Sequence, residues 1–205
     1  MLGGLWRRAL LWDAQQKWRR IAPALAARAA RTLLDIGCGA GALAHQLALT
    51  RADLHITCVD LQAAPLFADL KVSTWDGHTL PYAAQQFDAA LLLTVLHHCP
   101  DPDAVLREAL RVARTVVIVE DVYDTAWQRR LTYFFDSLFN WQWQAHWMLR
   151  WQGAPAHPRS NRSDAVWRAS FAQAGWVLEE ASQQRFLGLF TQACYVLRGT
   201  NPSTT

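Results

Sequence analysis

The chain has 205 residues, of which 52% are hydrophobic and 18% charged, and its formal net charge is +3. These values predict one globular domain, 1–205, with a sizeable core, and they exclude a disordered chain. The small net charge gives no reason to expect binding to nucleic acid. Because the first residues lack the order of a signal peptide and the four cysteines form no C-x-x-C pair, we expect a cytoplasmic protein with reduced thiols.

Apolar runs alternate with helical patterns along most of the chain, which predicts a mostly parallel sheet. Helices are expected at 41–50, from the N-cap Asp101 followed by Pro102, and from the N-cap Ser163 to Gly175. Only a short connection joins the last two expected strands. The pattern therefore predicts an α/β, Rossmann-like, doubly wound seven-stranded sheet with an antiparallel last strand. The expected strands are 32–36, 54–59, 71–75, 87–95, 114–120, 176–182 and 190–197.

Two segments stand outside this alternation. Residues 1–30 predict an N-terminal helical cap of two helices that break near Pro23. Residues 122–160 hold five of the eleven tryptophans and predict a helical aromatic insertion, which we interpret as a lid. Two alternatives stay open for these segments: the aromatic side chains only pack the lid on the core, or tryptophan and arginine together form a membrane-facing surface.

A turn with three glycines follows the first expected strand. The segment reads Asp35-Ile36-Gly37-Cys38-Gly39-Ala40-Gly41 and leads into a helix. Glycine at alternate positions allows positive φ and lets a ligand approach the backbone closely. The first N–H groups of the helix and its positive dipole end lie beside the turn. Asp35 at the strand end would repel phosphate, and it favours a ligand that carries an ammonium or sulfonium charge.

Further polar residues follow the next strands at their carboxyl ends, where open α/β sheets bind ligands. Asp60, followed by Leu61, ends the second expected strand at the place where a carboxylate accepts hydrogen bonds from ribose hydroxyls. Asp76-Gly77 follows the third strand, and Thr94 with His97-His98 ends the fourth. An Asp-Gly pair is also the usual composition of a simple turn.

Taken together, these features in this order resemble the class I S-adenosylmethionine-dependent methyltransferases, in particular the small-molecule type 11 subgroup that includes quinone and sterol methylases. The resemblance covers about 32–120 and implies S-adenosylmethionine as the cofactor. It places Asp35, Gly37, Cys38, Gly39 and Gly41 around the methionine part. It further implies that Asp60 holds the ribose, that Leu61, Asp76 and Gly77 contact the adenine, and that Thr94 and His97 lie between cofactor and acceptor.

Other functions remain open from the sequence. Gly37, Gly39 and Ala42 also fit the dinucleotide pattern G-x-G-x-x-A, and Asp60 would serve NAD equally well, so an NAD-dependent oxidoreductase is the alternative. A non-catalytic module that binds S-adenosylmethionine is a further one. Asp35 and the Asp76-Gly77 pair favour methyl transfer.

If the acceptor must lose a proton, the candidate bases are His97, His98, Glu120 and Asp121. Asp124 is expected to cap the following helix instead. Some related quinone O-methyltransferases carry a Glu-x-x-Glu-His cluster where this chain has Thr94 to His98, so we expect no metal site. The aromatic segments predict a hydrophobic or aromatic acceptor that is methylated on oxygen or carbon. A membrane, through peripheral contact, or an acyl carrier protein would present it. The oligomeric state stays open.

Overall fold

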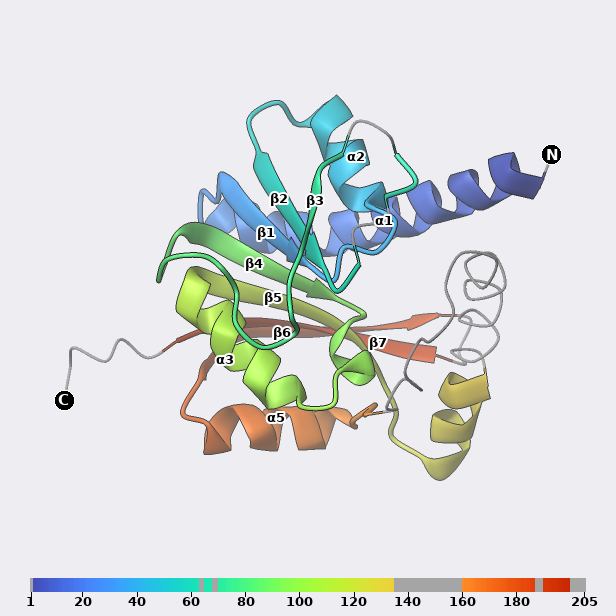
Figure 1. Ribbon diagram of the computed structural model, residues 1–205. Coiled ribbons are helices and arrows are strands. Elements are labelled where there is room, and N and C mark those ends of the chain that lie inside the picture. Colours follow the sequence, from blue (N-terminus) through green and yellow to red (C-terminus); the bar gives the residue numbers. More distant parts are fainter. Residues whose placement is uncertain (1, 63–64, 68–69, 135–159, 187–189, 200–205) are drawn as a thin grey trace.

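The structure, a computed structural model, describes residues 2–62, 65–67, 70–134, 160–186 and 190–199 (Figure 1). Within this part of the chain seven strands form one sheet in the order β3-β2-β1-β4-β5-β7-β6. Strands β1 to β5 run parallel, and β7 lies antiparallel to both β5 and β6. The predicted fold is therefore confirmed. The strands are β1 Thr32–Ile36, β2 His55–Asp60, β3 Val72–Thr74, β4 Phe87–Leu93, β5 Ala113–Val122, β6 Val177–Phe186 and β7 Phe190–Arg198.

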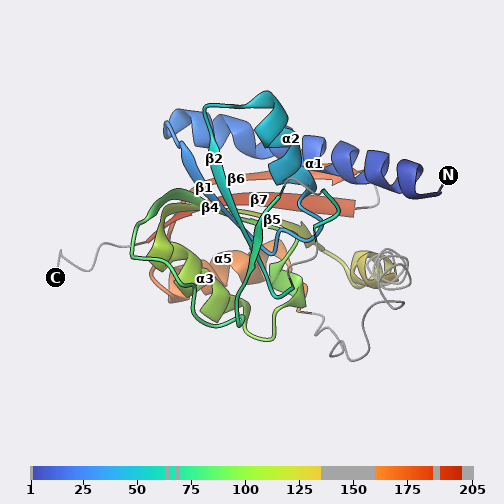
Figure 2. The same cartoon turned by 45° about the horizontal axis from the view of Figure 1, so that its top comes forward.

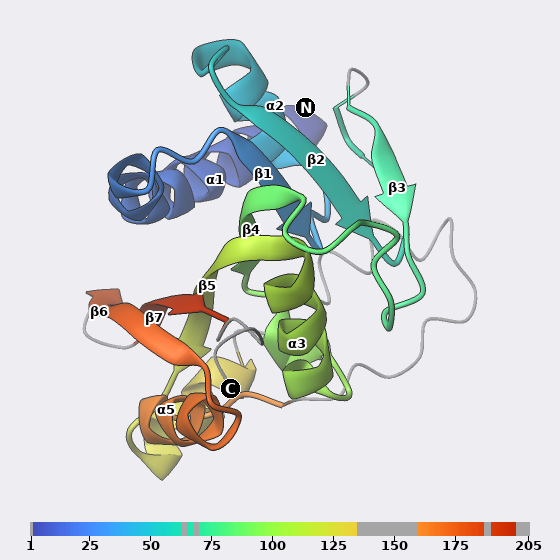
Figure 3. The ribbon, with the colours of Figure 1, turned by 90° about the vertical axis from the view of Figure 1, so that its left-hand side faces the viewer.

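Helices cover both faces of the sheet, as Figure 3 shows. Helices α1 (Leu2–Ala27) and α2 (Ala42–Thr50) lie on one face, and α3 (Pro102–Val112) and α5 (Asp164–Gln173) on the other. Successive side chains along a strand point to opposite faces of the sheet, so they pack alternately with the two helix layers. In β1, Leu33 packs with the α1–α2 layer, whereas Leu34 packs with the α3–α5 layer.

The expected ends of α3 and α5 are confirmed. The Asp101 side chain accepts a hydrogen bond from the Ala104 N–H, and the Ser163 side chain accepts one from the Val166 N–H. Gly175 follows the end of α5 with a φ of 72°, a conformation that glycine adopts without strain.

The predicted break of the N-terminal cap is wrong. Helix α1 runs without interruption through Pro23. A proline inside a helix removes one backbone hydrogen bond. Here the last turns are held by tertiary packing, because Ile21, Ala24 and Leu25 are buried against the sheet. Burial of this apolar surface offsets the lost bond.

The helix after β5, residues 126–134, begins differently from the prediction. Its cap is Thr125 and not Asp124. The Thr125 hydroxyl accepts from the Gln128 N–H at 3.2 Å, and the Gln128 side-chain oxygen accepts from the Thr125 N–H at 3.1 Å. This reciprocal pair is a capping box, which satisfies two helix-end donors at once. The remainder of the predicted lid, 135–159, lies outside the described residues, including Trp141, Trp143, Trp147 and Trp151.

Candidate active site

The candidate site lies at the carboxyl edge of the parallel strands. The chain leaves β1 toward β2 on one side and later returns through β4 on the other, so β1 and β4 form the switch point of the sheet. Open α/β sheets bind their ligands in the crevice at this point. Figure 2 shows the loops after β1, β2 and β4 gathered at that edge, with the N-terminal half of α1 projecting past it.

The glycine turn has the expected conformation. Gly37, Gly39 and Gly41 have φ values of 73°, 53° and 76°. A Cβ at Gly37 would lie 2.7 Å from the Val95 side chain, so that glycine is needed for packing. A Cβ at Gly39 would meet no atom within 4 Å. The middle of the turn therefore faces open space beside the sheet edge, as a ligand cradle must.

Asp60 braces this turn from the end of β2. One carboxylate oxygen accepts from the Gly39 N–H at 2.7 Å, and the other accepts from the Gln62 N–H at 3.3 Å. Burial raises the pKa of Asp60, while the backbone N–H groups that bond the carboxylate oppose the rise. The carboxylate thus stands directly beside the open face of Gly39. Sequence and structure agree on its position.

The predicted adenine contacts lie next to one another. Leu61 is 62% exposed, which is unusual for a large apolar side chain, and a Cβ at Gly77 would lie 3.2 Å from its Cδ2. Asp76 forms a turn, in which one carboxylate oxygen accepts from the N–H groups of His78 and Thr79 at 2.8 and 2.9 Å. These bonds lower the pKa of Asp76. The turn explains Asp76 by itself, so a role at the adenine remains a prediction.

Asp35 is almost fully buried at the end of β1. Burial raises the pKa of Asp35 from 3.8 to about 7, the charge of Lys17 opposes the rise, and the charge of Asp60 adds to it. Lys17 comes from α1. It donates to the Thr94 hydroxyl at 2.9 Å and pairs with Asp13 at 2.9 Å. The sequence analysis does not single out Lys17, which the structure places beside the end of β4.

Strand β4 ends at Leu93 and not at the predicted residue 95. Thr94 takes a φ of 61°, a left-handed conformation that is uncommon for threonine, and the chain then forms a short 3₁₀ helix at Leu96–His98. Because His97 and His98 lie on this turn and not on a strand, their rings lie side by side. The ring centroids of His97 and His98 are 3.9 Å apart.

Glu120 holds this turn from the neighbouring strand β5. It is fully buried, and its Oε1 accepts from the N–H groups of Val95 and Leu96 at 2.9 and 2.7 Å. Its Oε2 lies 2.6 Å from His97 Nδ1. With both oxygens engaged in this way, Glu120 holds the turn and the His97 ring in place. Its role as a catalytic base stays a prediction. His97 and Cys38 lie where they were expected, at the β4 end and in the glycine turn.

Asp121 joins a second polar network on the same edge. The Gln192 amide of β7 donates to the Asp121 carboxylate at 3.0 Å, and Arg20 of α1 donates to the Gln192 side-chain oxygen at 2.8 Å. Burial raises the pKa of Asp121, and the hydrogen bond from Gln192 and the charge of Lys17 oppose the rise. Helix α1 therefore brings two cations, Lys17 and Arg20, to an edge that is rich in carboxylates.

The described residues contain neither a cluster of metal ligands nor a membrane-spanning helix. In that part of the chain no three histidine, cysteine, aspartate or glutamate side chains gather in a way that could hold a metal ion. None of its helices has the length and apolarity needed to span a bilayer.

Comparison with known proteins adds to this geometry. Residues 34–118 match the family model described as a methyltransferase domain. The ubiquinone biosynthesis O-methyltransferase of Pseudomonas putida (strain GB-1) is 31% identical over 100 residues, 43% of this chain. The matched stretch spans only 42% of that relative.

Solved structures share the fold over most of the chain. A chain of the complex between the Haloferax volcanii Trm112 methyltransferase activator and a methyltransferase has a TM-score of 0.62 at 17% identity, covering 98% of this chain and 97% of that one. Magnesium protoporphyrin IX methyltransferase from Synechocystis PCC 6803, with bound SAH, has a TM-score of 0.60 at 16% identity, covering 90% and 83%.

The strand order and the glycine turn at the switch point define the class I methyltransferase fold. Within it, residues 34–118 are similar to a methyltransferase domain, and the described chain shares the fold of the solved methyltransferase structures.

Proposed function

We propose that this protein transfers the methyl group of S-adenosylmethionine to an oxygen atom of a hydrophobic, aromatic acceptor. The observation that carries the proposal is that two groups of residues lie at the same edge of the sheet. One is the open glycine turn with Asp60 and Asp35, and the other is the His97–Glu120 pair that follows β4. A relative named as an O-methyltransferase supports oxygen over carbon as the methylated atom.

The residues present fit the cofactor in chemistry and position. The space beside Gly39 would take the amino acid part, with the Asp60 carboxylate next to it for the ribose hydroxyls. Asp35 would pair with the ammonium group, and Lys17 would face the α-carboxylate, so that charges of opposite sign meet at both groups. The exposed Leu61 would pack on the adenine. Dinucleotide phosphates would instead meet the carboxylates of Asp35 and Asp60.

The bound cofactor would supply a methyl group that is already activated by its sulfonium charge. The protein then has to align the acceptor and exclude water, and such orientation is worth about 7–11 kcal/mol of the barrier. His97 is held through Nδ1 by the Glu120 carboxylate, and we assign the proton of this bond to Nδ1. Nε2 is then the nitrogen that would accept the hydroxyl proton of the acceptor.

The surroundings of the edge support a hydrophobic acceptor. The helix at 126–134 follows β5 directly, and its Trp127 and Phe134 side chains are 67% and 62% exposed. Figure 1 shows this helix and the N-terminal half of α1 on the same side of the sheet, beyond its carboxyl edge. Large exposed aromatic side chains near a site mark a surface for an apolar ligand. The acceptor would reach the protein from a membrane or on an acyl carrier protein.

The test has two parts. Calorimetry should show binding of S-adenosylhomocysteine and none of NADH. Transfer of labelled methyl from S-adenosylmethionine should then occur to phenols with an apolar tail.

His97→Gln should reduce this turnover by about a hundredfold, which is the contribution of a general base. His98→Gln, its neighbour on the same turn, is the matched control. NADH binding without S-adenosylhomocysteine binding would refute the cofactor, and cofactor binding without any transfer would indicate a non-catalytic module.

A further inference from the structure

A second feature of α1 lies on its outer side, away from the sheet. Arg8, Trp12, Gln15 and Arg19 are exposed and recur at helical spacing, so they form one stripe along the helix. The Trp12 side chain is 55% exposed. The buried side of the same helix carries Ala14 and Ile21, among other residues.

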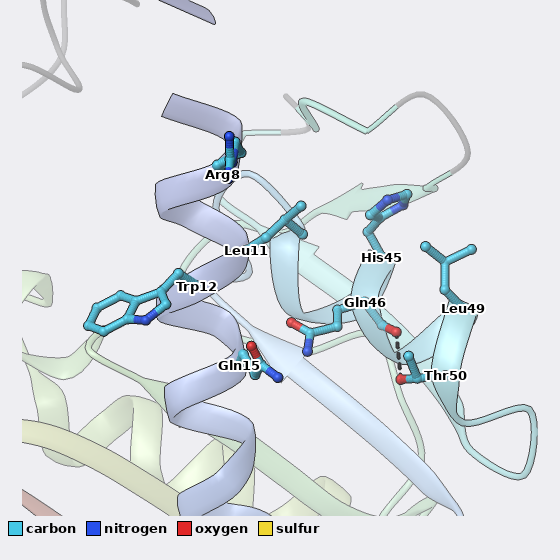
Figure 4. A pocket seen from close by; sticks show the side chains of 8 residues that line it. All are labelled: Arg8, Leu11, Trp12, Gln15, His45, Gln46, Leu49 and Thr50. Carbon is cyan, nitrogen blue, oxygen red and sulfur yellow. Dashed lines mark hydrogen bonds between the residues drawn. The ribbon is translucent and has the colours of Figure 1, made fainter. Parts of the chain in front are cut away.

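Helix α2 completes a surface with this stripe. A groove of about 340 Å³ runs between the two helices, and Figure 4 shows α1 on one side of it and α2 on the other. Leu49 at its α2 side is 72% exposed. We call this surface the α1–α2 face. The groove is lined by Arg8, Leu11, Trp12, Gln15, His45, Gln46, Leu49 and Thr50.

The charge of the face has one dominant sign. The first turn of α1 contains no acidic residue. Arg7 and Arg8 are exposed near its N-terminus, and the guanidinium of Arg7 lies 4.9 Å from the centroid of the Phe67 ring, which holds the charge at the surface. Asp13, the acidic residue of α1, pairs with Lys17.

We propose that the α1–α2 face docks on the surface of an anionic phospholipid membrane. A helix with arginines beside exposed tryptophan and leucine is the composition that lies in the bilayer interface, where the arginines pair with phosphate and the apolar side chains enter the acyl boundary. An acidic protein would match the charge but would leave Trp12 and Leu49 without an apolar phase, unless it offered a complementary apolar surface. The N-terminal half of α1 projects past the carboxyl edge of the sheet, so docking would bring the site toward the bilayer (Figure 2).

The experiment is sedimentation of the full chain with vesicles of phosphatidylcholine alone or with 30% phosphatidylglycerol. We expect binding to the anionic vesicles that weakens with salt. Arg8→Gln with Arg19→Gln should weaken it about 30-fold, since each basic residue near such a surface is worth about fivefold. Trp12→Ser with Leu49→Ser should weaken it by about tenfold or more.

Matched controls come from the other face of the molecule. Arg107→Gln with Arg114→Gln removes two exposed arginines, and Val166→Ser removes an apolar side chain of α5 that is 50% exposed. These variants should bind vesicles as the unchanged protein does. Unfolding temperature and S-adenosylhomocysteine binding monitor the fold of every variant. Absence of vesicle binding, equal binding to both vesicle types, or equal losses in the controls would overturn the proposal. None of these readouts depends on methyl transfer, so this inference and the proposed function can fail separately.

Discussion

Replacement of Asp35 by asparagine should stabilise the ligand-free protein at neutral pH. The raised pKa of Asp35, about 7 against 3.8, means that the folded state keeps a proton which the unfolded state has already lost. Each pKa unit corresponds to about 1.4 kcal/mol, so ionised Asp35 destabilises the fold by up to about 4 kcal/mol above pH 7. Asparagine has the same shape and carries no charge, so the variant is free of this cost.

The sign of the effect fixes its pH dependence. Between the unfolded and the folded pKa the folded state binds more protons, so the free energy of unfolding of the unchanged protein falls as pH rises. The advantage of Asp35→Asn should therefore grow by about 2 kcal/mol from pH 5 to pH 7 and level off near pH 8. Urea unfolding at pH 5, 6, 7 and 8 measures it, and Asp124→Asn, at an exposed position, is the control. An advantage that does not change with pH would refute the reasoning.

The same substitution should weaken ligand binding. If ionised Asp35 pairs with the ammonium group of the cofactor, Asp35→Asn should lose S-adenosylhomocysteine affinity at pH 8. The affinity of the unchanged protein should also fall as pH drops below about 7, because the carboxyl must then give up a proton to bind. Affinity of the variant equal to that of the unchanged protein at pH 8 would place the ammonium group elsewhere. A residue that costs stability and supplies affinity is typical of a binding site.

Further substitutions test the rest of the site. Asp60→Ala should weaken S-adenosylhomocysteine binding by about 1.5–3 kcal/mol per lost charge-assisted hydrogen bond, measured by calorimetry, and unchanged affinity would remove Asp60 from the site. Glu120→Gln should lower kcat and alter the pH profile of turnover with the cofactor affinity kept, since it acts through His97; equal losses in both would indicate a purely structural role. Lys17→Met should weaken binding of S-adenosylhomocysteine more than that of adenosine, which lacks the carboxylate, and equal losses would contradict the assignment. Activity should persist in EDTA, and activity that returned only with Mg²⁺ would show a metal requirement.

The parts of the site that the sequence predicts are those that depend on neighbours along the chain. The glycine turn requires particular φ angles at particular positions, and Asp60 follows from its place at a strand end. Lys17 could not be found in this way, because it reaches Thr94 across 77 residues of sequence and its helix carries several other basic residues. The contacts of Glu120 could likewise not be inferred from the sequence. Its type and position fit a base, and only the three-dimensional pairing with His97 and the turn shows both oxygens engaged.

The corrections in the fold have the same origin. Pro23 predicts a helix break because local hydrogen bonding is lost, and the burial of Ile21 against the sheet outweighs that loss. Asp124 and Thr125 are both good caps by residue type. Gln128 decides between them, since it stands three residues after Thr125 and completes a capping box there.

The net charge of +3 conceals how the charge is arranged, and α1 sets much of that arrangement. On its inner side the helix brings Lys17 and Arg20 to an edge where several carboxylates lie close together. These carboxylates repel one another, since the charge of Asp60 raises the pKa of Asp35. Without Lys17 the carboxyls of Asp35 and Asp121 would lose a positive charge that opposes the rise of their pKa values. On its outer side Arg8 and Arg19 are exposed. Helix α1 therefore places positive charge both at the carboxyl edge of the sheet and on the outer surface. Its position connects the candidate active site with the α1–α2 face.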